Sequence, residues 1–135
     1  MNVKKLAAAT VAVGVVVNAL DWLVHTQILR GQYAALSSLI RQPQDLPMHW
    51  LIIGDFVAAL VFVWVYDRVY GSFGGGPKGG ATYGLYAGVL VNFPTWIFMN
   101  LLVIGFPYSL AWIWTIYGIV WGVVAGAVAG AVYKK

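Results

Sequence analysis

The sequence predicts an all-α membrane protein, built as an up-down bundle of four transmembrane helices. Of the 135 residues, 61% are hydrophobic and only 9% are charged, and the mean hydropathy is +0.81. A soluble domain of this length cannot bury so much apolar surface. The apolar residues also form continuous runs without the in-out alternation of membrane β-strands, which favours helices.

Four apolar segments are each long enough for the about 20 residues that a helix needs to cross a hydrocarbon core of about 30 Å. They comprise residues 6–29, 48–66, 81–104 and 108–132, and we expect them to form one transmembrane domain. The first segment begins like a secretory signal peptide, with Lys4 and Lys5 before an apolar run. Because the hydrophobic residues continue as far as Leu29, we expect a retained helix rather than a cleaved signal.

The first connection, residues 30–47, has the pattern of a short helix. Apolar residues recur there at helical spacing: Tyr33, Leu36, Leu39 and Ile40. We therefore expect a short amphipathic helix that lies on the membrane surface in the first external loop.

The other two connections are rich in glycine and proline. Residues 71–80 contain six glycines, and Pro77 precedes Lys78 where a phosphate-binding loop needs glycine, so we expect a flexible linker. Residues 105–107 read as a tight turn, which makes the third and fourth helices antiparallel neighbours.

The basic residues predict the orientation in the membrane. Six of them flank one side of the predicted helices and two flank the other: Lys4, Lys5, Arg68, Lys78, Lys134 and Lys135 against Arg30 and Arg41. By the positive-inside rule, both termini are expected in the cytoplasm. Since these charges stand at helix ends as topology signals, a nucleic-acid partner is not expected.

Glycine recurs every four residues in the last two predicted helices. The rows are Gly80, Gly84 and Gly88 in the third helix, and Gly118, Gly122, Gly126 and Gly130 in the fourth. Such a glycine-zipper row lets helix backbones approach closely in lipid. We expect helix packing through these rows, within the bundle or at a homo-oligomer seam, although a high glycine content is also ordinary in membrane helices.

Ionisable residues inside the apolar segments point to a site. A carboxylate at the bilayer centre costs about 2.5–3.5 kcal/mol even on lenient scales, so such residues usually face the interior of a bundle. Asp21 and Asp55 fall at nearly equal depths below the outer helix ends, and a histidine lies above each of them. The candidate ligand-binding residues are Asp21, His25, Asp55, Asn18, Asn92 and Asn100.

The identity of the ligand stays open at this point. Asp21, His25, His49 and Asp55 are residue types that bind divalent metals, and a haem between the two histidines is a weaker alternative. Interhelical hydrogen bonding without any ligand is a further alternative that these residues fit. The outer half holds the polar groups and several tryptophans, whereas the inner half is rich in glycine. This asymmetry predicts a cavity that opens on the external side or in the outer leaflet.

No recognisable catalytic motif is present, and the chain has no cysteine, so enzymatic activity of its own is not expected. The leading hypothesis is a small membrane protein that binds an ion or a small polar ligand. The alternatives are an accessory subunit of a larger membrane complex, packed through its glycine-lined helices, and an oligomeric transporter.

Three features together resemble a family of small, uncharacterised four-span bacterial membrane proteins. They are the string LDWLVH at residues 20–25, Tyr33 in the first loop, and the string SLAWIW at residues 109–114 before the glycine steps. The resemblance implies a bacterial inner-membrane protein with four helices and implies no particular activity.

Overall fold

The computed structural model describes residues 2–134, apart from the side chain of Pro43, and these residues form helices, turns and loops. The elements in chain order are α1 (Val3–Trp22), η1 (Leu23–Ile28), α2 (Arg30–Ala35), η2 (Pro43–Asp45), α3 (Met48–Phe73), α4 (Gly76–Leu102) and α5 (Tyr108–Val132). The predicted all-α class is confirmed. Within the described residues, four helices are long and apolar enough to cross a membrane, the first being α1 continued by η1, which is the pattern of a multi-pass membrane protein.

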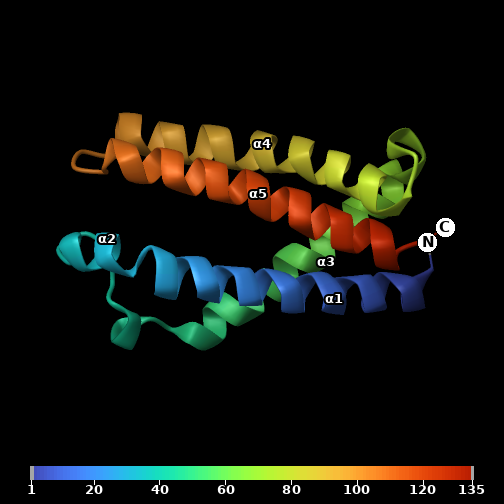
Figure 1. The fold of residues 1–135 in the computed structure, drawn as a ribbon, viewed down its shortest axis with the longest axis horizontal. Coiled ribbons are helices and arrows are strands. Elements are labelled where there is room, and N and C mark those ends of the chain that lie inside the picture. Colours follow the sequence, from blue (N-terminus) through green and yellow to red (C-terminus); the bar gives the residue numbers. More distant parts are fainter. Residues whose placement is uncertain (1, 135) are drawn as a thin grey trace.

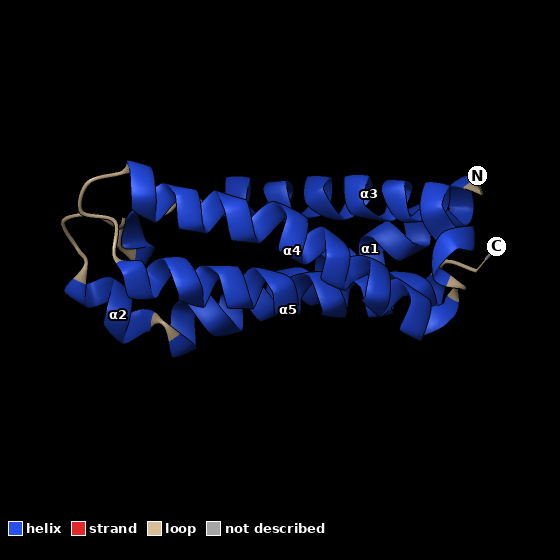
Figure 2. Ribbon diagram, turned by 90° about the horizontal axis from the view of Figure 1, so that it is seen from above, coloured by secondary structure: helices blue, strands red, loops and turns tan. Residues whose placement is uncertain are grey.

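The long helices run alternately up and down along one axis (Figure 1). Both ends of the chain and the α3–α4 connection lie at one end of the molecule, which we call the terminal end. The helix α2 and the α4–α5 turn lie at the opposite end, which we call the loop end. Figure 2 shows the same division from above.

The most extensive contact in the molecule joins α4 to α5. All seven glycines of the two rows are buried in the bundle. A Cβ atom added at Gly84 would overlap the carbonyl oxygen of Gly122, and one added at Gly126 would overlap that of Gly80. The two backbones therefore touch directly, which no other residue type would permit at these positions.

The helix α1 packs against both α3 and α5, and a core of small apolar side chains fills the space between them. Its centre consists of Ala9, Val13, Val17, Ala59, Val63, Ala125 and Ala129. Gly14 leaves room on α1 for the ring of Phe56, which a Cβ atom would overlap. These residues lie in the middle of α1 and α3 and in the last turns of α5, and the same cluster continues toward the terminal end through Leu6, Tyr66 and Tyr133.

A buried carboxylate secures the terminal end. Asp67 is only 3% exposed and accepts a hydrogen bond from the hydroxyl of Tyr133, which follows α5. Burial, together with this carboxylate, raises the pKa of Tyr133. Lys5 Nζ lies 2.5 Å from the carbonyl oxygen of Lys134, to which it donates, so the first turn of α1 is joined to the residues that follow α5.

The predicted flexible linker is wrong over most of its length, because α3 continues to Phe73 and α4 already begins at Gly76. Gly74 and Gly75 alone separate the two helices, and the φ angles of Gly74, Gly75 and Gly76 are 76°, 67° and 66°. Only glycine adopts this left-handed region without a steric penalty. Pro77 lies in the first turn of α4, where a backbone N–H has no acceptor within the helix, so its lack of an N–H costs no hydrogen bond.

The other helix ends agree with the expected ones to within a few residues. The first span begins at Val3 and ends at Ile28, and the third ends at Leu102 instead of residue 104. The first connection contains the six-residue helix α2 (Arg30–Ala35), and Leu36, Leu39 and Ile40 of the predicted amphipathic pattern lie beyond its end.

Replacing Gly84 by alanine should destabilise the fold, because its Cβ would force α4 away from the backbone of α5. We expect the free energy of unfolding to fall by about 1–3 kcal/mol, the usual cost of overpacking. Gly54→Ala is the matched control, since a Cβ atom there meets nothing within 4 Å. Thermal unfolding in mild detergent, followed by circular dichroism, measures both variants, and equal melting temperatures would contradict the close contact.

Candidate functional site

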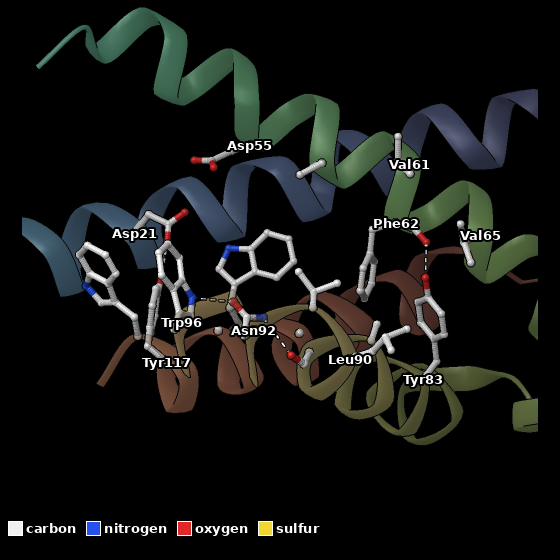
Figure 3. A pocket seen from close by; sticks show the side chains of 18 of the residues that line it. Asp21, Asp55, Val61, Phe62, Val65, Tyr83, Leu90, Asn92, Trp96 and Tyr117 are labelled. Carbon is white, nitrogen blue, oxygen red and sulfur yellow. Dashed lines mark hydrogen bonds between the residues drawn. The ribbon is translucent and has the colours of Figure 1, made fainter. Parts of the chain in front are cut away.

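A cavity of about 790 Å³ lies among the helices, with walls from α1, η1, α3, α4 and α5. Its polar lining residues are Asp21, His25, Asp55, Tyr83, Asn92 and Tyr117. The remaining lining consists of apolar side chains and glycines, including three tryptophans. In Figure 3 the two carboxylates lie toward one end of the cavity and Tyr83 lies at the other. The cavity therefore has an acidic end, and the rest of its wall is largely apolar.

The cavity opens sideways between α3 and α4. Three of its lining residues on these helices are largely exposed at the surface: Val61 is 53% exposed, Leu90 76% and Val91 60%. The Tyr83 hydroxyl donates to the Phe62 carbonyl oxygen across 2.9 Å and joins α4 to α3 toward the terminal end. In a membrane, an opening of this kind would face the acyl chains of the lipids.

Two carboxylates from different helices meet at the acidic end. Asp21, near the end of α1, accepts a hydrogen bond from the hydroxyl of Tyr117 on α5. Asp55, on α3, interacts electrostatically with Asp21. The Nε2 atom of His25 lies 4.0 Å from Asp21 Oδ1. Two adjacent negative charges repel each other, and a shared proton or a bound cation relieves that repulsion.

A second group of polar side chains positions His25. Trp114 Nε1 donates to the Tyr33 hydroxyl oxygen across 2.8 Å, and that oxygen lies 2.5 Å from His25 Nδ1. Burial raises the pKa of Tyr33, so the phenol keeps its proton at neutral pH. Since the phenol accepts from Trp114, its own proton is free to be donated to Nδ1. This assignment puts the His25 proton on Nε2, the nitrogen nearest Asp21.

The backbone around His25 is wider than an ordinary helix. Residues 23–28 form the π-helical turn η1, in which the Leu29 amide donates to the Val24 carbonyl oxygen at 2.8 Å. Single π-helical turns within helices are frequently found at functional sites. Here the turn lies directly after Asp21 and Trp22, and it carries His25 at the cavity wall.

The structure brings together four of the predicted ligand-binding residues, since Asp21, His25, Asp55 and Asn92 all line the cavity. Asn92 Nδ2 donates to the Gly88 carbonyl oxygen at 3.0 Å, and its Oδ1 accepts from Trp96 Nε1 at 3.2 Å.

The other predicted residues lie elsewhere. Asn18 donates to the Gly14 carbonyl oxygen within α1, and Asn100 donates to the Phe106 carbonyl oxygen in the α4–α5 turn. His49 is exposed and its ring lies against Trp50.

The metal hypothesis receives no support from this arrangement. Among residues 2–134, no group of three or more His, Cys, Asp or Glu side chains could hold a metal ion. His49, at the start of α3, is exposed and does not line the cavity, whereas the other three members of the proposed set do. Of the two histidines proposed to hold a haem, His25 lines the cavity and His49 does not.

Sequence reasoning missed the tyrosines that bind to the ionisable residues. Tyr117 and Tyr33 were not expected at the site, yet they contact Asp21 and His25. An aromatic residue in a membrane helix is commonly an interfacial anchor, so its type alone does not reveal a hydrogen-bond partner. The position of Tyr117 beside Gly118, in the row that packs on α4, was the one available indication that it faces inward.

Comparison of the chain with protein-family models, with curated proteins and with solved structures finds no match. The geometry of the cavity therefore carries the functional assignment by itself.

Replacing Tyr33 by phenylalanine should loosen the loop end, because His25 and Trp114 lose their common hydrogen-bond partner. We expect a loss of about 1–3 kcal/mol in the free energy of unfolding, together with faster amide exchange in η1 and α2. Tyr108→Phe is the control, since Tyr108 is 67% exposed and its ring contact with Trp112 is kept. Identical exchange in the two variants would show that Tyr33 does not position His25.

Proposed function

We propose that this chain is a multi-pass membrane protein that binds an amphiphilic molecule from the bilayer. The apolar part of the molecule lies along the wall formed by α3 and α4, and its polar end lies beside Asp21 and Asp55. The observation that carries this proposal is a single cavity that joins an acidic end to a long apolar wall and opens sideways through exposed side chains of both helices.

The cavity suits an amphiphile better than a small ion. Its volume of about 790 Å³ falls within the range of about 300–1,000 Å³ that is typical of ligand pockets. An ion or a small polar ligand would contact the acidic end alone and leave most of the apolar wall without a partner. A few oriented polar groups at one end of a largely apolar pocket are the usual means of fixing the orientation of a ligand.

We further propose a location in the bacterial inner membrane with both termini in the cytoplasm. The distribution of basic residues, six against two, supports this orientation. In this orientation the loop end and the acidic end of the cavity belong to the outer half of the membrane. The exposed side of α2 would lie at the outer surface, while its Tyr33 faces His25.

The orientation can be tested with single cysteines, because the chain contains none. Ser38 lies at the loop end and Ser72 lies near the end of α3, and both are exposed. In spheroplasts, a membrane-impermeant maleimide should label Ser38→Cys at once and Ser72→Cys only after permeabilisation. The unmodified protein is the blank, and the reverse labelling pattern would place the termini outside.

The binding function can be tested by filling the cavity. Ala58 lines it and is exposed, so Ala58→Phe should take up space without disturbing the core. Solvent extraction and mass spectrometry of protein purified in mild detergent should show an amphiphile retained by the wild type and lost, by tenfold or more, from this variant. Ala8→Phe is the control, since Ala8 is an exposed α1 residue outside the cavity.

Two results of that purification would contradict the proposal. Equal lipid content in the wild type and in Ala58→Phe would show that the cavity holds nothing specific. A stoichiometric partner protein, with no retained amphiphile, would favour the accessory-subunit alternative.

A further inference from the structure

We infer that the polar end of the bound amphiphile is a cation, namely a protonated amine or a quaternary ammonium group. This inference rests on the proposed function, and it specifies the chemical class of the ligand. Three independent features of the acidic end lead to it.

The first feature is charge. Asp21 and Asp55 contribute two carboxylates to the lining, and none of the described lining residues is Lys or Arg. The one basic side chain among them, His25, lies 4.0 Å from Asp21 and is directed to that carboxylate by Tyr33. Asp55 also lines the cavity, and the charged group with which it interacts there is the carboxylate of Asp21. A cation placed between the two carboxylates would relieve their mutual repulsion.

The second feature is the state of the hydrogen-bond donors. Three hydrogen-bond donors of the cavity wall already have acceptors in the protein. Tyr117 donates to Asp21, Trp96 donates to Asn92, and Trp114 donates to Tyr33. An anionic head group needs donors and would find these three in use, whereas a cationic group needs acceptors, which the carboxylates provide.

The third feature is the aromatic wall. Trp96, Trp114 and Tyr117 line the cavity, and Tyr117 donates a hydrogen bond to Asp21. The rings of Trp96 and Trp114 meet at 66° with centroids 4.6 Å apart, so they form a corner instead of a flat stack. The faces of tryptophan and tyrosine rings attract ammonium groups, and several such rings around one position are typical of sites for quaternary ammonium ligands.

The inference can be tested with three amphiphiles that share one brominated chain and differ only in the head group: trimethylammonium, hydroxyl and sulfate. Their brominated chains quench tryptophan fluorescence, so saturable quenching of the protein in a neutral maltoside detergent reports binding. We expect the ammonium compound to bind at least tenfold more tightly than the alcohol, and the sulfate to bind most weakly. The preference should disappear in Asp55→Asn and persist in Asp55→Glu.

Asp45→Asn is the matched control, because it removes an exposed loop carboxylate that does not line the cavity. It should bind the ammonium compound like the wild type, and Asp21→Asn provides a second test if Asp55→Asn does not fold. Equal affinities for the three head groups, all abolished by Ala58→Phe, would overturn the cation inference and leave the binding function intact. Saturable quenching by none of the three would contradict the binding function itself.

Discussion

Direct backbone contact between α4 and α5 is the constraint on which the other features depend. At positions such as Gly84 and Gly122, glycine packs against glycine and brings the two backbones into direct contact. The helix α1 packs against α5, and α3 packs against α1. As a result α3 meets α4 toward the terminal end, where Tyr83 bonds to Phe62, and the two helices leave a cavity beyond that point. The cavity is thus a consequence of how tightly the neighbouring pair is packed.

The acidic residues illustrate two ways of placing a carboxylate inside a bundle. Asp67 is almost completely buried and accepts a hydrogen bond from Tyr133, so it joins α3 to the residue that follows α5 at the terminal end. Asp21 is also bonded, by Tyr117, but it shares its surroundings with the carboxylate of Asp55 at the edge of a cavity. Placing two like charges together costs free energy, and stability alone gives no reason to retain such a pair. Because of this contrast, we assign a ligand-binding role to Asp21 and Asp55 at the loop end and a structural role to Asp67 at the terminal end.

Much of this architecture follows from the sequence, because continuous apolar runs dictate helices and glycine rows dictate close packing. The equal depth of Asp21 and Asp55 also follows from helical rise alone. The continuation of α3 and α4 through residues 71–80 did not follow, since glycine composition indicates flexibility and does not reveal which glycines take positive φ angles. The hydrogen bonds of Asn18 and Asn100 to nearby backbone carbonyl groups were not predictable either. Such local acceptors compete with any ligand for the side-chain amide. The roles of Tyr33 and Tyr117 depend on contacts across long stretches of chain, which spacing within one helix cannot show.

The central claim is that the cavity between α3 and α4 binds an amphiphile whose charged end lies at Asp21 and Asp55. An experimental density map of the protein extracted with its native lipid tests this claim most directly. We predict an elongated density between Val61 and Leu90 that ends in a compact head group within contact distance of both carboxylates and of the Trp96–Trp114 corner. A map in which α3 closes onto α4 along its whole length, with no cavity and no density, would contradict the account.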